Sequence, residues 1–208
     1  MKNFLEKDYY SDEVLYIVGV DEAGRGPLAG PLVACALILK KDYNNELIND
    51  SKKLSEKTRL LLFDEILKNS HAYYISVIDP KTIDEINILN ATKKAMQEAL
   101  SNLNHRIDLI FTDAVKLDNF DVPLYPIVKG DQKVKAIAAA SIIAKVTRDN
   151  LMFELHKQYP LYRFDLHKGY PTKLHLQLLK KYGPIKNIHR FSYKPIRRLN
   201  KLSLFENN

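Results

Sequence analysis

The sequence of 208 residues contains little cysteine, glycine or proline and has no long hydrophobic run. Its single cysteine, Cys35, excludes an intramolecular disulfide, so we expect a buried thiol in a reducing compartment, the cytoplasm. Only 7 Gly and 9 Pro exclude collagen-like and low-complexity chains. The longest apolar run, LVACALIL, is much shorter than the roughly 20 residues of a membrane span, and the N-terminal segment MKNFLEKDYY does not resemble a signal peptide. We therefore predict a protein without a membrane segment.

Charge and length indicate the kind of partner and the number of domains. The chain carries 32 Lys and Arg against 25 Asp and Glu, a net charge of +7, which suggests a polyanionic partner, although many basic proteins are merely soluble. With 46% apolar residues, the chain can form one well-buried core. We expect one domain over residues 1–195, a C-terminal tail over residues 196–208, and a monomer.

The hydrophobic pattern predicts an α/β architecture in which helices flank a mixed sheet. Apolar and β-branched runs predict strands over residues 14–20, 32–39, 72–78, 107–111 and 124–128. Helical spacing of apolar residues predicts helices over residues 55–68, 90–103, 133–157 and 172–182. The short connection between the first two strands favours an antiparallel pair.

Acidic residues lie at predicted strand ends. Asp21 and Glu22 are adjacent at the end of the first strand, and Asp113 follows the strand at 107–111. If Asp113 and Asp131 come from neighbouring strand ends, the four carboxylates raise one another's pKa unless a cation neutralises them. Oxygen ligands select Mg²⁺ or Mn²⁺, and no Cys and His pattern with zinc spacing occurs. A pair of such ions can activate water against a phosphodiester, whereas the alternative is that each acid is a solvated strand terminus.

A glycine-rich turn with the sequence GRGPLAG, residues 24–30, follows the first two acids. It resembles a phosphate-binding glycine loop, so a dinucleotide site is an alternative. Pro27 and Pro31 argue against it, because they remove amide donors where a helix N-terminus would present them. The neighbouring acids would also repel a pyrophosphate. What remains is bare backbone that a sugar can approach closely.

Several blocks of sequence occur together in one known family. They are GVDEAGRGP at 19–27, KGD at 129–131, IAAASIIAKVTRD at 137–149, HKGYPT at 167–172 and HR at 189–190. In order and spacing, over about residues 14–195, they resemble bacterial ribonuclease HII. The resemblance implies a ribonuclease H-like fold, a mixed five-stranded sheet flanked by helices with a C-terminal helical segment.

The resemblance also implies an activity. Members of this family are metal-dependent endoribonucleases that use Mn²⁺ or Mg²⁺. Their substrates are RNA–DNA hybrids and duplex DNA with embedded ribonucleotides, which they cut on the 5′ side of the ribonucleotide to leave a 3′-hydroxyl and a 5′-phosphate. The catalytic, metal-binding acids of the family correspond here to Asp21, Glu22, Asp113 and Asp131.

Substrate-binding residues follow from the same resemblance. The turn formed by Gly24, Arg25 and Gly26 reads the ribose 2′-hydroxyl through close backbone contact, and Tyr170 stacks on the following deoxyribose. The 2′-hydroxyl is the group that distinguishes RNA from DNA. Basic residues near the motifs are candidates for phosphate contacts, with a solvated surface charge as the alternative for each; they are Lys145, Arg148, Lys168, Lys173 and Arg190.

Two positions depart from the family pattern. Ala114 stands where the family usually has Gly, which predicts a more restricted backbone at Asp113. The segment 191–193 reads Phe-Ser-Tyr where Arg-Ser-Phe is more usual, and we expect little effect from this difference. Four histidines are assigned no catalytic role, because capping and packing are commoner functions of a single histidine; they are His156, His167, His175 and His189.

The C-terminal segment Lys-Leu-Ser-Leu-Phe, residues 201–205, resembles the Gln-Leu-x-Leu-Phe motif with which bacterial replication proteins bind the sliding clamp. Lys201 occupies the position of Gln, and an apolar tail that folds back on its own domain is the alternative.

Two rival functions remain for the whole chain. One is a non-catalytic hybrid-binding protein, which has no use for acids that repel phosphate; the other is another nuclease of the same fold, such as a resolvase or transposase core.

Overall fold

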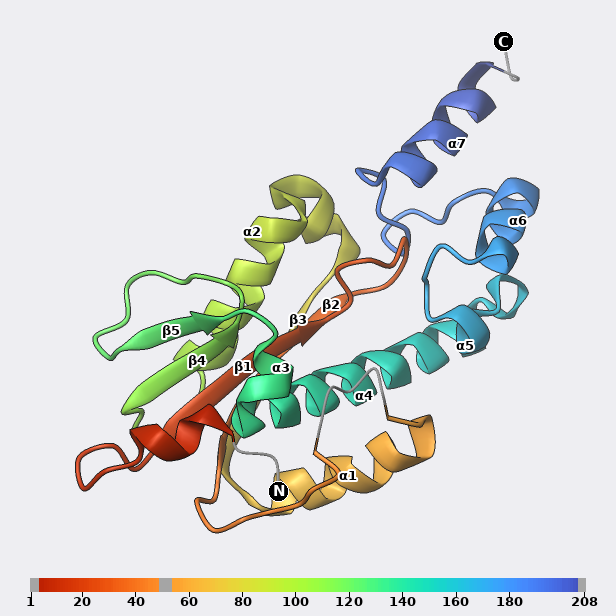
Figure 1. Cartoon of the computed structure of the whole chain (residues 1–208). Coiled ribbons are helices and arrows are strands. Elements are labelled where there is room, and N and C mark those ends of the chain that lie inside the picture. Colours follow the sequence, from red (N-terminus) through yellow and green to blue (C-terminus); the bar gives the residue numbers. More distant parts are fainter. Residues whose placement is uncertain (1–3, 49–53, 206–208) are drawn as a thin grey trace. The chain divides into compact units, whose positions relative to one another are not determined.

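The computed structural model describes residues 4–48 and 54–205, with only the backbone of residues 200–205. Within these residues, five strands form one sheet in the order β3-β2-β1-β4-β5 (Figure 1). The strands are β1 (Ile17–Ala23), β2 (Leu32–Leu39), β3 (Ser70–Ile78), β4 (Leu109–Asp113) and β5 (Leu124–Ile127). β1 pairs antiparallel with β2 and parallel with β4, which pairs parallel with β5. The predicted mixed sheet and the antiparallel first pair are confirmed.

The helices are α1 (Glu56–Lys68), α2 (Pro80–Ser101), α3 (Gly130–Lys133), α4 (Lys135–Gln158), α5 (Phe164–His167), α6 (Lys173–Tyr182) and α7 (Lys194–Phe205). Local sequence explains where two of them begin. The Ser55 hydroxyl accepts a hydrogen bond from the amide of Thr58 at the start of α1, and Thr172 accepts one from His175 at the start of α6. Both caps satisfy amides that the first helical turn leaves unpaired.

The first strand begins and ends three residues later than predicted. Pairing with β2 continues to Ala23, opposite Val33, and this ladder extends the strand past its apolar run. Asp21 and Glu22 therefore lie within β1 rather than beyond its end. Pairing with β2 satisfies the backbone hydrogen bonds of these polar residues. The hydrophobic pattern cannot predict this pairing, so the predicted strand ended too early.

Helix α2 begins ten residues before the predicted start. The strand predicted over 72–78 does end at Ile78, and the helix begins directly after it. The Asp79 carboxylate accepts hydrogen bonds from the amide and hydroxyl of Thr82, and Pro80 occupies the first helical position. Inside α2, Asn87 has φ +66° and ψ 165°, and its side chain accepts from the amides of Leu89 and Asn90. The element is thus two helical segments, each with its own N-cap.

Over the described residues, the chain divides into two compact units. Unit 1 comprises the residues up to 23 together with 33–76 and 93–146, and it contains most of the sheet. Unit 2 comprises 24–32, 77–92 and the residues from 147 onward. One apolar cluster of unit 1 is built on Ile17, Phe111 and Ile137, and unit 2 has its own cluster around Met152 and Phe164. The expected boundary between residues 195 and 196 falls inside α7.

Candidate functional site

Four carboxylates of unit 1 come from two adjacent strands and the short helix beside them. Asp21 and Glu22 are on β1, Asp113 ends β4, and Asp131 is in α3. The parallel register of β1 and β4 brings Asp21 level with Asp113. Because the two strands are neighbours, these acids come from the same edge of the sheet.

A hydrogen bond joins the end of β4 to the start of α3. The Asp113 Oδ1 atom accepts from the amide of Gly130 at 2.8 Å, and Lys129 has φ +57°, a left-handed conformation that turns the chain into α3. Asp131, which is only 6% exposed, follows directly. Sequence alone placed Asp131 at a strand end, whereas it lies in the short helix α3, whose first residue, Gly130, is bonded to Asp113.

Asp21 is deeply buried beside other acids. Its side chain is only 4% exposed, and its Oδ1 accepts from the amide of Glu22 at 2.7 Å. Burial, followed by repulsion from Glu22 and Asp113, raises the pKa of Asp21 well above its ordinary value, although a hydrogen bond with Ser141 opposes this. The molecule therefore holds like charges together in a poorly solvated place, and a bound cation would relieve this repulsion.

The chemistry of this donor set fits a hard divalent cation, because all the side-chain ligands on offer are carboxylate oxygens. Among the described residues, however, no three His, Cys, Asp or Glu side chains are arranged so as to hold a metal ion together. Asp21 and Asp113 each direct one oxygen to a backbone amide. A cation would have to draw the carboxylates together against their mutual repulsion, which its own charge can do.

The glycine-rich turn lies in unit 2, where two buried arginines donate hydrogen bonds to its backbone carbonyls. Gly24 has φ +108°, and a Cβ there would overlap the side chain of Arg148. Arg148 donates from Nε to the carbonyl of Pro31 at 2.9 Å and from Nη2 to that of Ala29 at 3.1 Å. Arg190 donates from Nη2 to the carbonyl of Gly30 at 2.8 Å. These bonds fix the main chain on the far side of the turn.

Our prediction that Arg148 and Arg190 contact phosphates does not agree with the structure. Both side chains are 0% exposed, and all three nitrogens of each guanidinium donate to atoms of unit 2. Burial and repulsion from Arg190 lower the pKa of Arg148 to about 10, so it remains charged at neutral pH. Sequence could not distinguish a buried structural arginine from an exposed phosphate ligand.

The structure brings Tyr170 to the same turn. The amide of Leu28 donates to the carbonyl of Gly169 at 2.8 Å, and a Cβ at Gly26 would lie 3.6 Å from the ring of Tyr170. Gly169 has φ +81°, and a side chain there would collide with the carbonyl of Ala29. Arg25, Gly26 and Tyr170 are all exposed, so the two predicted substrate-reading elements form one accessible surface of unit 2.

The remaining basic candidates differ in accessibility. Lys145 is half-buried on α4, and Lys173 is exposed at the start of α6. Lys168 is half-buried, donates to the carbonyl of Asp165 and lies 3.6 Å from the centre of the Phe153 ring. Lys168 therefore would have to leave these contacts to reach a phosphate, whereas Lys173 would not.

Three of the four singled-out histidines form a buried chain in unit 2. The His189 Nδ1 atom accepts from the amide of Ile185, so its Nε2 carries the proton and donates to His175 Nε2 at 3.2 Å. His175 then donates from Nδ1 to the carbonyl of Tyr170 at 3.0 Å. His167 stacks on His175 with ring centres 4.1 Å apart. The two bonds that His189 Nδ1 and His175 Nε2 accept require neutral imidazoles, and both rings are buried, which indicates a packing role.

Both departures from the family pattern carry a structural consequence. Ala114 has φ +56°, a left-handed conformation that costs a residue with a Cβ about 1 kcal/mol. The predicted restriction next to Asp113 is thus a real one.

Tyr193 is a residue to which sequence reasoning assigned no role: its hydroxyl donates to the carbonyl of Arg25 at 2.6 Å. The difference between Tyr and Phe in segment 191–193 was the available signal.

The sheet order and the acids on adjacent parallel strands define the class: this is a ribonuclease H-like α/β protein. Residues 18–196 match the family model described as Ribonuclease HII. The chain belongs to the ribonuclease HII family. In the described part of the chain, no helix is both long and apolar enough to cross a membrane.

Named relatives agree with this assignment. The chain is 55% identical over 188 residues to the ribonuclease HII of Ruminiclostridium cellulolyticum, covering 90% of this chain and 73% of the relative. It is similar to the crystal structure of ribonuclease H2 from Pyrococcus horikoshii, with 28% identity, a TM-score of 0.77 and coverage of 93% and 100%. It is also similar to the ribonuclease HII in a complex with PCNA from Archaeoglobus fulgidus, with 26% identity, a TM-score of 0.72 and coverage of 86% and 96%.

Proposed function

We propose that this chain is a metal-dependent endoribonuclease that hydrolyses the RNA strand of RNA–DNA hybrids and incises duplex DNA 5′ to embedded ribonucleotides. Its products would carry a 3′-hydroxyl and a 5′-phosphate. The observation that carries the proposal is the group of carboxylates on β1, β4 and α3, in a chain that belongs to the ribonuclease HII family. A protein that only binds hybrids gains nothing from buried acids that repel phosphate.

The acids would hold Mn²⁺ or Mg²⁺. We assign this role to Asp21, Glu22, Asp113 and Asp131, of which Asp21 and Asp131 are the most buried. When bound, the cation would offset the carboxylate charge, lower the pKa of water and stabilise negative charge on the phosphate. The hydrogen bond from the Glu22 amide to Oδ1 of Asp21 orients this carboxylate.

The turn formed by Gly24, Arg25 and Gly26 would bind the substrate together with Tyr170; Arg25, Gly26 and Tyr170 are exposed, whereas Gly24 is buried against Arg148. The exposed Gly26 leaves the backbone accessible to a ribose, and the Tyr170 ring, 38% exposed, can stack on a sugar. The buried charges of Arg148 and Arg190 lie beneath this surface and would favour a polyanion above it. Lys145, Lys168 and Lys173 are the further candidates for phosphate contacts. We propose that one chain acts as a monomer.

The test uses three duplexes: DNA with one embedded ribonucleotide, an RNA strand on DNA, and DNA alone. With Mg²⁺ or Mn²⁺ we expect incision 5′ to the ribonucleotide and cleavage of the RNA strand, with no product from DNA alone or in EDTA. Cleavage of DNA alone would instead indicate another nuclease of this fold. Binding to hybrids without cleavage in either metal would indicate a non-catalytic binding protein.

The substitution Asp21→Asn tests the acidic site directly. Loss of one ligand should lower turnover by about a thousandfold or more, because several kcal/mol of charge stabilisation are lost. Binding to a hybrid should change little, since the basic surface is intact. The control is Asp118→Asn, which alters an exposed acid outside the cluster and should retain activity. Near-normal turnover of Asp21→Asn would contradict the assignment.

A second proposal concerns a protein partner. We propose that residues 201–205 bind a sliding clamp, which the complex of the Archaeoglobus relative with PCNA supports. These residues belong to α7, and their side chains lie outside the described part of the structure. The test is binding of purified clamp by the full chain and by a variant that lacks residues 200–208. Equal affinity of the two, or none, would refute the proposal.

A further inference from the structure

Tyr193 lies directly before α7 and contacts the substrate-reading turn. Its hydroxyl donates to the carbonyl oxygen of Arg25 at 2.6 Å and accepts from Nη1 of Arg190 at 3.0 Å. The same Nη1 lies 3.3 Å from the Arg25 oxygen. Two donors from the buried side of unit 2 therefore meet at one carbonyl of an otherwise exposed turn.

This carbonyl controls the direction of a neighbouring donor. The Arg25 carbonyl and the Gly26 amide belong to one peptide plane, in which the C=O and N–H bonds point in opposite directions. Glycine follows this plane and glycine precedes Arg25, so few steric barriers would otherwise prevent its rotation. A hydrogen bond that holds the Arg25 oxygen toward Tyr193 thus holds the Gly26 N–H toward the opposite, exposed side.

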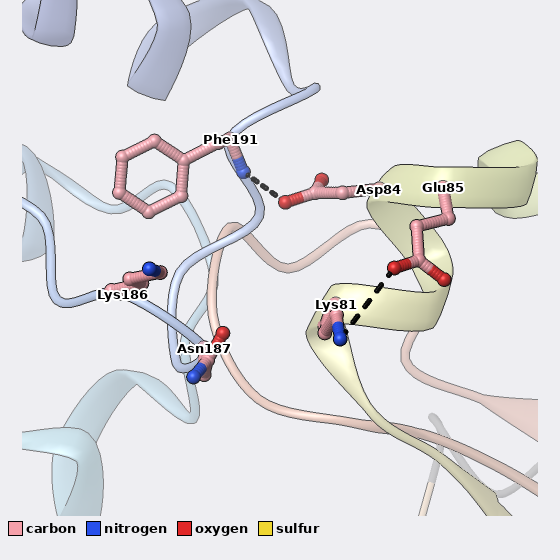
Figure 2. A pocket seen from close by; sticks show the side chains of 6 residues that line it. All are labelled: Lys81, Asp84, Glu85, Lys186, Asn187 and Phe191. Carbon is pink, nitrogen blue, oxygen red and sulfur yellow. Dashed lines mark hydrogen bonds and ion pairs between the residues drawn. The ribbon is translucent and has the colours of Figure 1, made fainter.

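Tyr193 is itself held in place by contacts on both sides. The Asp84 carboxylate accepts from the amide of Phe191 at 2.7 Å and from the amide and hydroxyl of Ser192 at 2.9 and 2.6 Å, as Figure 2 shows for Phe191. On the other side, the amide of Arg197 donates to the carbonyl of Tyr193 in the first turn of α7. The guanidinium of Arg190 lies 5.3 Å from the centre of the Tyr193 ring.

We propose that Tyr193 is a positioning residue for ribose recognition: its hydroxyl fixes the Arg25–Gly26 peptide so that the Gly26 amide is presented to the substrate. The inference rests on the proposed function. It replaces our sequence-based expectation that the Tyr at this position has little effect, because a Phe ring could fill the same space but could not hold the Arg25 oxygen.

The test is the substitution Tyr193→Phe, assayed on a DNA duplex with one embedded ribonucleotide. Loss of one hydrogen bond to the turn should raise KM about fivefold, because a smaller fraction of molecules has the binding-competent turn. The value of kcat should stay within about twofold, since bound substrate restores the same peptide orientation. An all-DNA duplex used as a competitive inhibitor should keep its inhibition constant, because it has no 2′-hydroxyl to be read.

A matched control is Tyr162→Phe. The Tyr162 hydroxyl donates to the carbonyl of Gly183 at 2.7 Å, a bond of the same kind in unit 2 but away from the turn. This variant should lose stability to a similar degree and keep the wild-type KM. The substitution Asp84→Ala tests the same peptide indirectly, because it removes the hydrogen bonds that hold the segment before Tyr193. It should also raise KM more than it lowers kcat.

The outcomes separate the inference from the proposed function. A wild-type enzyme that does not prefer the ribonucleotide duplex over DNA contradicts the proposed function. If the wild type shows this preference and Tyr193→Phe has an unchanged KM, the inference alone is wrong. It is also wrong if the KM and the inhibition constant of the DNA competitor rise together, or if kcat falls while KM does not change.

Discussion

At the scale of single residues, the molecule buries charge in two different ways. The carboxylate of Asp21 is surrounded by like charges, and the raised pKa of this acid records the cost. Arg148 and Arg190 are equally buried, but backbone carbonyls accept from all their nitrogens. Satisfied hydrogen bonds stabilise a buried charge, whereas repulsion between carboxylates destabilises the folded chain until a cation binds.

The substitution Asp21→Asn should therefore raise stability in the absence of metal. An amide keeps the shape of the carboxylate and its bond from the Glu22 amide, and it removes repulsion from Glu22 and Asp113. We expect a gain of about 1 kcal/mol in the free energy of unfolding, measured with urea in EDTA. A loss of stability would show that the buried carboxylate is favourably paired without metal.

Ala114 offers a second test at this scale. Because its φ is +56°, replacing Ala114 by Gly removes the strain of a Cβ in the left-handed region. We expect Ala114→Gly to raise the free energy of unfolding by about 0.5–1 kcal/mol. The control is Ala72→Gly on β3, a position without positive φ, where the same change should be destabilising. If both variants lose stability alike, the strain at Ala114 is absent.

At the scale of secondary-structure elements, caps decided boundaries that hydrophobic periodicity located only approximately. The predicted helices over 55–68 and 172–182 agree with α1 and α6 because Ser55 and Thr172 are visible cap signals. The first half of α2 was missed because Asp79-Pro80 can end a strand as well as begin a helix. In the structure these residues do both, since β3 ends at Ile78 and α2 begins at Pro80.

The substitution Ser55→Ala measures the value of one cap. It removes the acceptor for the amide of Thr58 and should lower the free energy of unfolding by about 1 kcal/mol, determined by urea denaturation. The variant Ser55→Asp retains an acceptor and adds a negative charge at the helix N-terminus, so it should keep wild-type stability. Equal loss in both variants would mean that the hydroxyl, rather than any cap acceptor, is required.

At the scale of the whole molecule, buried histidines should make stability depend on pH. Burial lowers the pKa of His175 to about 4 and that of His189 to about 3, against an ordinary value of 6.5. Below pH 6.5 the unfolded chain binds protons that the folded chain excludes, so this contribution to stability is complete above pH 6.5 and is lost progressively as the pH falls toward 4.

We expect the free energy of unfolding to be lower at pH 5 than at pH 7.5 by about 2 kcal/mol for each of the two histidines, about 4 kcal/mol together, from urea denaturation followed by circular dichroism. The variant His189→Gln should show a smaller difference between the two pH values. The control His105→Gln, whose imidazole lies outside this cluster, should show the wild-type difference. Identical pH dependence of all three proteins would contradict a role for the buried cluster.

The linear chain contained enough to predict the α/β class, the strand β2 to the residue, the capped helices, the family, and the residue types of an acidic metal site. These features depend on local periodicity, caps and ordered motifs, which need no knowledge of distant contacts. Folding decided that Asp21 lies level with Asp113, that Asp131 lies in a short helix whose first residue is bonded to Asp113, and that Arg148 and Arg190 are buried. It also decided that Tyr193 meets Arg25, 168 residues away along the chain. Such contacts between distant residues depend on strand register and packing. Neither the charge of a residue nor a sequence motif predicts which distant residue it will contact.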